Sequence, residues 1–235
     1  MINITLNRLP QIDKEIDEAY KQLRTNLMFC GDDIKTVMFT STLPNEGKSE
    51  VSYFVARSIA ESGRRTLLLD ADIRKSVFYS RFLPDKKVPG LSHYLAGKEN
   101  LDNIVCQTNV EELYMIFAGT TVPNPSELLG SRRFSMMLEA LKKVFDYIII
   151  DSPPVGSVID AAVIGTHVDG GVLVVGYDDV SHKAAAKAKA QLEMGGCRLL
   201  GAVLNRVDIR KGSYYGGYYG KYYGHYGKEH AEVHK

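Results

Sequence analysis

Apolar residues along the chain gather in short continuous runs, and stretches with helical spacing separate these runs. The runs span residues 35–41, 65–70, 147–151, 171–177 and 198–205. Strands that are apolar on both sides are typical of a sheet covered on both faces. Between the runs, apolar residues three or four positions apart predict helices over residues 49–63, 126–145 and 160–166, and from residue 181 onward. The alternation predicts an open, doubly wound α/β domain with a mostly parallel sheet, in which ligands bind where the strands end.

Both ends of the chain depart from this alternation. Residues 12–29 have apolar side chains at helical spacing, which predicts a further helix before the first strand. Residues 211–235 are rich in Gly and Tyr and hold almost no aliphatic side chain that could build a core. We therefore predict one domain over residues 1–210 and a flexible, disordered, tyrosine-rich tail over residues 211–235.

Composition and charge exclude several classes of protein. With 45% hydrophobic and 24% charged residues in 235, the chain is neither disordered throughout nor fibrous. Its longest apolar runs are shorter than the roughly 18 residues of a membrane span, so we expect a cytoplasmic protein. A net charge of +1 gives no general attraction to nucleic acid, and we expect no such partner. Cys30, Cys106 and Cys197 match no disulfide or zinc spacing.

The segment STLPNEGKSE, residues 41–50, follows a predicted strand and opens a predicted helix, which is the context of a Walker A phosphate-binding loop. Its backbone N–H groups and the positive end of the helix would surround the β- and γ-phosphates of a nucleotide. Gly47 lets the backbone approach, Lys48 would reach phosphate oxygens, and the Ser49 hydroxyl would bind Mg²⁺. The residues expected to contact the nucleotide here are Pro44, Asn45, Glu46, Gly47, Lys48, Ser49 and Glu50.

One position departs from the Walker A pattern. Thr42 stands where the pattern has its first glycine. Because Thr is unfavourable at positive φ, we expect the loop to enter in an ordinary extended conformation, helped by the rigid Pro44. A helix start without any ligand is the alternative, but the acidic residues described next favour nucleotide binding.

Three aspartates lie at the ends of predicted strands. Asp70 and Asp72 follow the run LLL and share one side if the backbone stays extended, and Asp151 ends YIIID. An aspartate after a buried strand is typical of a Walker B motif, which holds a metal directly or through water. Any one of them alone could instead cap a turn. Three at the edge that carries a phosphate loop indicate phosphoryl transfer, in which a carboxylate accepts the proton of the attacking hydroxyl.

The combination of these segments resembles a known family. Walker A STLPNEGKS, the Walker A′ segment LLLDADIR, Walker B IIIDSPP and a tyrosine-clustered C-terminus resemble the bacterial tyrosine kinases, or BY-kinases, of capsule and exopolysaccharide operons. GLSHYLAG from residue 90 and AGTTVPNPSELLGSRRF from residue 118 extend the resemblance to the short cytoplasmic form of Gram-positive bacteria. The resemblance implies a MinD/ParA-like P-loop NTPase fold and a non-specific protein-tyrosine kinase that uses ATP and Mg²⁺ and regulates polysaccharide synthesis and export.

The resemblance also implies roles for individual residues. Lys48 and Ser49 would hold phosphates and Mg²⁺. Asp70 would be the catalytic base for the tyrosine hydroxyl, and Asp72 and Asp151 would serve the metal, although the division between Asp70 and Asp72 stays open. The kinase would autophosphorylate in trans, on the tail of a neighbouring subunit. Its phosphate acceptors would be Tyr214, Tyr215, Tyr218, Tyr219, Tyr222, Tyr223 and Tyr226.

The end of the last predicted strand matches the place where related P-loop ATPases read the adenine. The residues there are Asn205 and Arg206. An amide can pair with an adenine edge, but an asparagine at a strand end is also a common turn former.

The N-terminal helix, within residues 1–30, resembles the E-x-x-R-x-x-R self-association motif of the family. The corresponding residues are Glu18, Lys21 and Arg24. Because Lys21 lacks the planar fork of Arg, a bidentate contact at that position would be weaker. The resemblance implies a homo-oligomeric ring, an octamer being one option, and a solvated amphipathic helix is the alternative.

Other proteins are implied by the resemblance alone. A separate transmembrane polysaccharide co-polymerase would activate the kinase and recruit it to the inner face of the cell membrane. A cognate tyrosine phosphatase would remove the phosphate.

Two other functions stay open at this point. One is a MinD/ParA-type ATPase switch, but those proteins carry a second lysine early in the loop, where this chain has Leu43. The other is a scaffold that binds ATP only to assemble, without kinase activity. The tail itself could be an adhesive Gly/Tyr segment. Formation of phosphotyrosine would separate these functions.

Overall fold

The computed structural model describes residues 1–207. Its strands form a single sheet of eight strands. The strands lie in the order β1-β4-β5-β3-β6-β2-β7-β8, and all neighbours are parallel except β4 and β5. They span Ile2–Asn3 (β1), Thr36–Ser41 (β2), Thr66–Asp70 (β3), Cys106–Gln107 (β4), Leu113–Ile116 (β5), Tyr147–Asp151 (β6), Gly170–Gly176 (β7) and Leu199–Asn205 (β8). The predicted mostly parallel α/β sheet is therefore confirmed.

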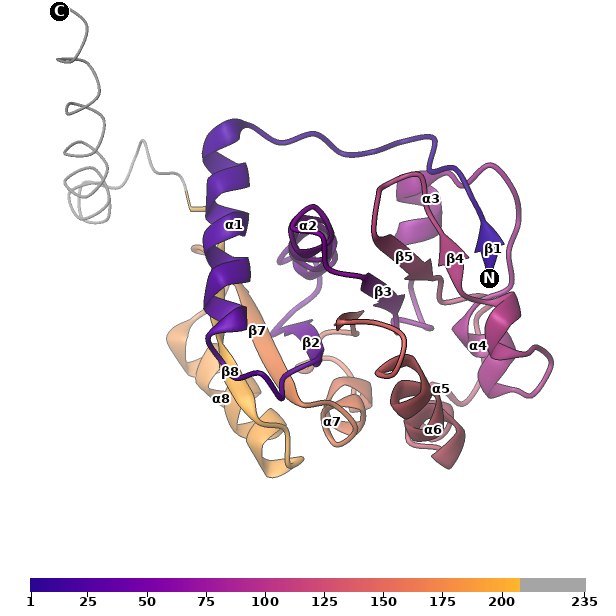
Figure 1. Cartoon of the computed structure of the whole chain (residues 1–235). Helices are drawn as coiled ribbons and strands as arrows, with labels where there is room; N and C mark the ends of the chain where they lie inside the picture. The colour runs from indigo at the N-terminus through magenta and orange to yellow at the C-terminus, as the bar shows by residue number, and fades with distance from the viewer. Residues whose placement is uncertain (208–235) are drawn as a thin grey trace, which may run out of the picture.

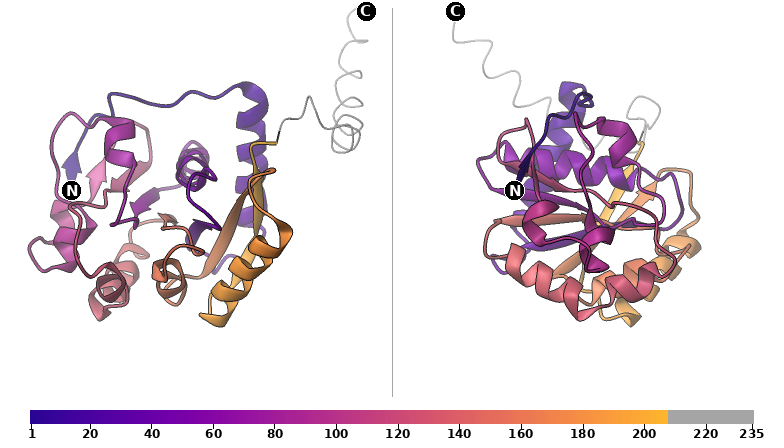
Figure 2. Two further views of the ribbon diagram at one scale, coloured as in Figure 1. Left: turned by 180° about the vertical axis from the view of Figure 1, so that it is seen from behind. Right: turned by 90° about the vertical axis from the view of Figure 1, so that its right-hand side faces the viewer.

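Helices cover both faces of this sheet (Figure 1, Figure 2). They span Lys14–Met28 (α1), Lys48–Ala60 (α2), Phe78–Phe82 (α3), Leu91–Leu95 (α4), Pro125–Leu129 (α5), Arg132–Leu141 (α6), Asp160–Gly165 (α7) and His182–Met194 (α8), with a short 3₁₀ helix at Leu101–Asn103. Along β2, Val37 and Phe39 belong to the apolar core under α1 and α2, whereas Met38 belongs to the core under α6, α7 and α8. Two cores explain why the central strands show no alternation of apolar and polar positions.

The helix predicted over residues 126–145 is in fact two helices, α5 and α6. The break falls at Gly130 and Ser131, and Ser131 caps α6 by accepting a hydrogen bond from Phe134 N at 3.3 Å. A Cβ at Gly130 would lie 3.2 Å from a methyl carbon of Val163 in α7. The close packing of α7 and the serine cap therefore account for the break.

Several elements between residues 71 and 125 were not predicted from the sequence. They are α3, α4, β4 and β5, together with β1 near the N-terminus. Each has two to five residues, which is too short for a period of 2 or 3.6 to stand out. The β4 and β5 pair is the antiparallel exception within the sheet.

The structure leaves some of the domain predictions untested. The predicted boundary at residue 210 and the tyrosine-rich tail lie outside the described residues. Within residues 1–207, no helix combines the length and the apolar character needed to cross a membrane.

Candidate active site

The loop between β2 and α2 is the predicted phosphate-binding loop, and it lies at the carboxyl edge of the sheet. Asn45 and Gly47 adopt positive φ angles of 68° and 89°, a conformation that Gly and Asn tolerate best. Thr42 has no positive φ, as expected from its side chain. A Cβ at Gly156, in the loop after β6, would lie 2.2 Å from Thr42 O. Gly156 therefore allows the segment after β6 to pack directly on the phosphate loop, a role that the sequence analysis missed.

Glu46 holds this loop in place from inside the protein. Its side chain is buried, and its two carboxylate oxygens accept hydrogen bonds from Leu43 N at 2.6 Å and Gly176 N at 3.0 Å. The Asn205 amide at the end of β8 donates to Glu46 O at 2.9 Å. The loop is thus tied to the ends of β7 and β8. A nucleotide contact by Glu46 would come from its backbone, because its carboxylate is engaged.

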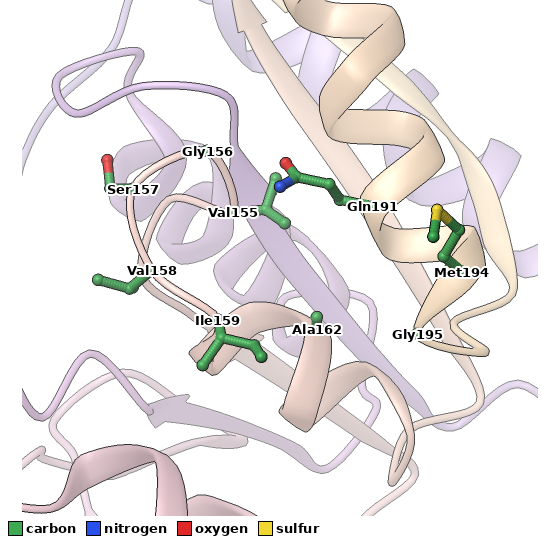
Figure 3. A pocket seen from close by; sticks show the side chains of 9 residues that line it. All are labelled: Val155, Gly156, Ser157, Val158, Ile159, Ala162, Gln191, Met194 and Gly195. Atoms are coloured by element: carbon green, nitrogen blue, oxygen red, sulfur yellow. The ribbon is translucent and has the colours of Figure 1, made fainter.

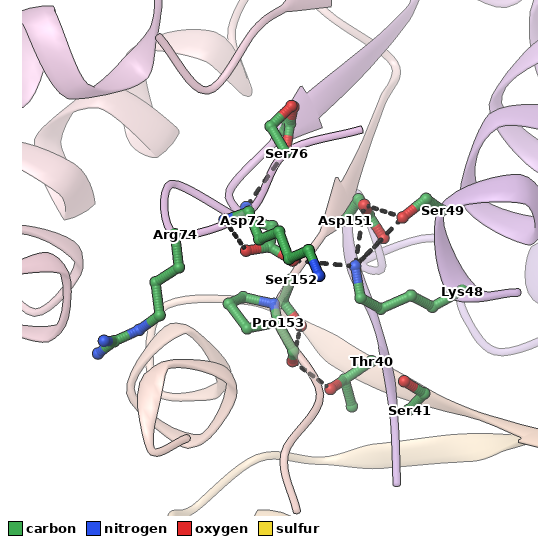
Figure 4. Close-up of polar contacts among 12 residues, drawn as sticks. Thr40, Ser41, Lys48, Ser49, Asp72, Arg74, Ser76, Asp151, Ser152 and Pro153 are labelled. Atoms are coloured by element: carbon green, nitrogen blue, oxygen red, sulfur yellow. Dashed lines mark hydrogen bonds and ion pairs between the residues drawn. The ribbon is translucent and has the colours of Figure 1, made fainter. Parts of the chain in front are cut away.

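Four predicted residues meet at the start of α2 (Figure 4). Lys48 Nζ lies 3.3 Å from Asp72 Oδ2 and 3.3 Å from Asp151 Oδ2. The Ser49 hydroxyl donates to Asp151 Oδ2 at 2.6 Å. The structure therefore brings together Walker A, Walker A′ and Walker B side chains around one ammonium group. Ser52, which the sequence analysis did not single out, adds a hydrogen bond to Asp151 Oδ1 at 3.3 Å.

Asp70 lies next to this cluster, on the side of the protein interior. It pairs in register with Asp151 across β3 and β6, and it is fully buried, whereas Asp72 is 7% exposed. The Ser76 hydroxyl donates to Asp70 Oδ2, and Asp72 N donates to Asp70 Oδ1 at 3.2 Å. Ser76 is a further residue that no sequence signal indicated. These contacts hold Asp70 and Asp72 side by side at the end of β3.

Burial and neighbouring charges shift the pKa values of these groups. Burial raises the pKa of Asp70 to about 8, and the Asp151 carboxylate acts in the same direction. Burial also raises the pKa of Asp151, although the Lys48 ammonium opposes this shift. For Lys48, burial would lower the pKa, but the Asp151, Asp72 and Asp70 carboxylates raise it overall. The three carboxylates therefore favour the charged form of Lys48, and burial favours the neutral form of Asp70 and Asp151.

Two other predicted nucleotide contacts lie at the rim of the site. Arg206, with a φ of 62°, makes an ion pair with Asp179 at 3.0 Å. Glu50 lies in the first turn of α2, and its carboxylate is 3.8 Å from the Arg81 guanidinium. Both side chains are substantially exposed.

The three residues of the predicted self-association motif make contacts within their own chain. Lys21 pairs with Asp17 at 2.9 Å and with Glu18 at 2.7 Å on α1. Arg24 donates to Ser58 O, near the end of α2, at 2.7 Å. Arg24 therefore docks α1 on the helix that begins at the phosphate loop, and any role in assembly comes in addition to this one.

A separate cavity of about 470 Å³ opens between the loop after β6 and helices α7 and α8 (Figure 3). Its lining includes Val155, Ile159, Gln191 and Met194, and no lining residue is charged. None of the residues predicted to bind nucleotide lines this cavity. An uncharged cavity does not suit a triphosphate, so the loop between β2 and α2 stays the candidate phosphate site.

Comparison with known proteins identifies the family. Residues 36–176 match a family model described as an AAA domain. The tyrosine-protein kinase CpsD of Streptococcus pneumoniae is 44% identical over 201 residues, which cover 86% of this chain and 88% of that protein. The chain belongs to this family of bacterial tyrosine-protein kinases. It is therefore an ATP-binding P-loop tyrosine kinase of capsule synthesis, as the sequence predicted.

Solved structures agree with this family and with the fold. A chimerical protein named CapA2B2 superposes with a TM-score of 0.79 at 31% identity, covering 88% of this chain and 94% of that chain. MinD of Pyrococcus horikoshii, complexed with Mg-ADP, superposes with a TM-score of 0.65 at 23% identity, covering 74% and 71%. The likeness to MinD shows the shared fold alone. The much higher identity to a tyrosine kinase favours kinase activity over an ATPase switch or a scaffold.

Proposed function

We propose that this tyrosine kinase transfers the γ-phosphoryl group of ATP to the tyrosines at positions 214–226 of a neighbouring copy. The observation that carries the proposal is the cluster of Lys48, Ser49, Asp72 and Asp151 beside the phosphate loop, with Asp70 directly behind it. The acceptor tyrosines lie outside the described residues, and their role rests on the family and on their concentration in the sequence.

ATP binding would use the existing contacts of Lys48. Its ammonium is shared between two carboxylates at 3.3 Å. When phosphate oxygens enter the loop, the Lys48 ammonium would bind them and give up part of its contact with the two carboxylates. Asp72 and Asp151 would then be available as ligands for Mg²⁺. Asn205 and Arg206 would contact the base at the rim of the same loop.

The donor set fits Mg²⁺. Ser49, Asp72 and Asp151 offer a hydroxyl and two carboxylates, the oxygen ligands that this ion prefers. In the described part of the chain, no three His, Cys, Asp or Glu side chains are grouped into a metal site of their own. Mg²⁺ needs no such group, because phosphate oxygens and water supply its other ligands. When bound, it would neutralise the charge of the β- and γ-phosphates.

The tyrosine hydroxyl must lose its proton during attack, and we propose Asp70 as the group that accepts it. Its pKa of about 8 is close to the working pH, as general base catalysis requires. Asp70→Asn should then abolish the increase in phosphorylation rate that accompanies rising pH. Asp72→Asn should chiefly raise the MgCl₂ concentration that the reaction needs. The reverse pattern would assign the base to Asp72, which is the more exposed of the two.

We also propose how the kinase assembles and how it is regulated, on the basis of its resemblance to the family. We infer that α1, with Glu18, Lys21 and Arg24, contributes to a homo-oligomeric ring. A transmembrane polysaccharide co-polymerase would recruit the cytoplasmic kinase to the membrane and activate it, and a cognate tyrosine phosphatase would reverse the modification.

The decisive experiment is phosphopeptide mapping of purified protein with ATP and MgCl₂, with an activator tail added if it is required. Phosphate should appear on tyrosines after residue 213, and Lys48→Met should abolish it. Release of inorganic phosphate without phosphotyrosine would contradict the proposal. Mixing the Lys48→Met chain with an active chain that ends at residue 210 tests transfer between subunits, because only the inactive chain then carries acceptors.

A further inference from the structure

Arg74, Asp160 and Ser126 form a closed polar network beside the active site. Arg74 Nε and Nη2 donate to the two carboxylate oxygens of Asp160 at 2.6 and 2.9 Å, which is a bidentate ion pair. The Ser126 hydroxyl donates to Asp160 Oδ1 at 2.6 Å, and Arg74 Nη2 donates to Ser126 Oγ at 3.2 Å. Asp160 is fully buried, so both of its oxygens depend on these two partners.

The network joins the two segments that carry the proposed metal ligands. Arg74 follows Asp72 by two residues in the Walker A′ segment. Asp160 begins α7, the first helix after Asp151 in the Walker B segment. Ser126 adds α5 as a third element. Figure 4 shows the Arg74 side chain pointing away from Lys48, so it takes no part in the cluster around the ammonium.

The residues on either side of Asp72 are anchored in the sheet and the core. Ala71 N donates to Asp151 O at 2.8 Å, and Ile73 is buried in the core under α6 and α7. The other contacts of the turn after Asp72 are local, from Lys75 N to Asp72 Oδ1 at 3.0 Å and from Asp72 N to Asp70 Oδ1 at 3.2 Å. These bonds shape the turn, and the bond from Ala71 fixes its start to β6, but none of them connects the turn to α7. The Arg74 and Asp160 pair does so.

We propose that Arg74 is a positioning residue, which through Asp160 and Ser126 holds the turn after Asp72 against α7, helps to fix the placement of Asp72 relative to Asp151, and thereby raises the affinity for Mg²⁺. This inference rests on the proposed role of Asp72 and Asp151 as metal ligands. Lys at position 74 would keep the charge but lose the planar fork, so it could bind only one carboxylate oxygen well. The separation of the two segments would then be less sharply defined.

The test is the Mg²⁺ dependence of nucleotide binding by full-length Arg74→Lys, measured with a fluorescent ADP analogue and titrated MgCl₂. The half-saturating MgCl₂ concentration should rise about tenfold or more, the usual effect of removing a group that orients metal ligands. Binding of the same probe in EDTA should be unchanged. Ser126→Ala, which leaves the ion pair in place, should produce a smaller shift in the same direction.

The matched control is Arg198→Lys. Arg198 pairs with Asp33 at 3.7 Å, and both side chains are more than half exposed. These residues precede β8 and β2, at the opposite edge of the sheet, so the control should match the wild type. An Mg²⁺ requirement of Arg74→Lys equal to that of the wild type would overturn the inference. So would an equal loss of binding with and without Mg²⁺, since that pattern indicates a general structural defect. Asp72→Asn and Asp151→Asn with unchanged Mg²⁺ dependence would instead refute the proposed metal ligands.

Discussion

Ser49 and Asp151 touch through a 2.6 Å hydrogen bond, although 102 positions separate them along the chain. The contact links the end of the Walker A loop to the end of β6. It places the two groups that we propose as metal ligands within reach of one ion.

Asp151→Asn removes a charge from the centre of this arrangement. Because catalysis of phosphoryl transfer depends on correctly placed charges, tyrosine phosphorylation should fall on the order of a hundredfold or more. Radiolabel transfer under saturating ATP measures the loss. A variant that keeps near-normal activity would rule out Asp151 as a metal ligand.

Glu46→Ala should weaken nucleotide binding indirectly, because the Glu46 carboxylate bonds to the protein backbone and would have no direct contact with the nucleotide. The change leaves Leu43 N and Gly176 N without their acceptor, and it should cost about 1–3 kcal/mol of unfolding free energy. Urea denaturation and nucleotide titration report the two effects. Glu193→Ala, at an exposed ion pair on α8, is the control and should change neither quantity.

Gly156→Ala tests the close approach of the loop after β6 to the phosphate loop. The added methyl group would lie 2.2 Å from Thr42 O, a backbone atom that cannot move aside cheaply. Overpacking of this kind should cost about 1–3 kcal/mol of stability and reduce ATP affinity. Gly201→Ala meets nothing within 4 Å and should leave ATP affinity unchanged. Equal ATP affinities for the two variants would show that the loop has room to adjust.

Asp169 should make stability depend on pH at a place remote from the active site. Burial alone would raise its pKa, but hydrogen bonds from Thr36 and Lys35 and the ion pair with Lys142 lower it below the ordinary value. A carboxyl with a lowered folded-state pKa stabilises the protein above its unfolded pKa, and this stabilisation is lost as pH falls through the folded value.

Asp169→Asn should therefore be less stable than the wild type by about 1–3 kcal/mol at pH 7. The difference should begin to shrink below about pH 4, where the carboxyl of the unfolded wild type takes up a proton, and it should be lost as the pH falls through the lower folded-state pKa. Denaturation curves at pH 7 and pH 3.5 decide this point. A constant difference between the two proteins would show that charge is not the source of the effect.

Arg24→Ala and Glu18→Ala should differ in what they disturb. Arg24 holds α1 on α2 through Ser58 O, so its loss should lower the melting temperature as well as any self-association. Glu18 is 61% exposed and should affect self-association alone. Calorimetry and light scattering separate the two properties. Equal melting temperatures for both variants would contradict the docking role of Arg24.

Much of the fold follows from local pattern. The continuous apolar runs predicted β2, β3, β6, β7 and β8. The first four of these have buried residues in both apolar cores, whereas β8 is an edge strand that is only partly buried. The Walker segments predicted the meeting of Lys48 with Asp72 and Asp151, since parallel strands end at one edge. The network of Arg74 and Asp160 could not be predicted, because its partners are 86 positions apart and share no periodic signal. The break at Gly130 could not be predicted either, because it depends on packing against Val163 in α7, which is distant along the chain.

The amide of Asn205, at the end of β8, donates a hydrogen bond to Glu46 O. This bond ties the end of the last described strand to the predicted phosphate-binding loop. The described part of the chain therefore ends, at residue 207, beside the loop where we propose that ATP binds. If the proposed ring forms, a substrate tyrosine would have to cover the spacing between adjacent nucleotide sites, and the diameter of one domain would not matter. Replacing residues 208–213 by longer or shorter linkers would then change which tyrosines are modified first, without altering the catalytic groups.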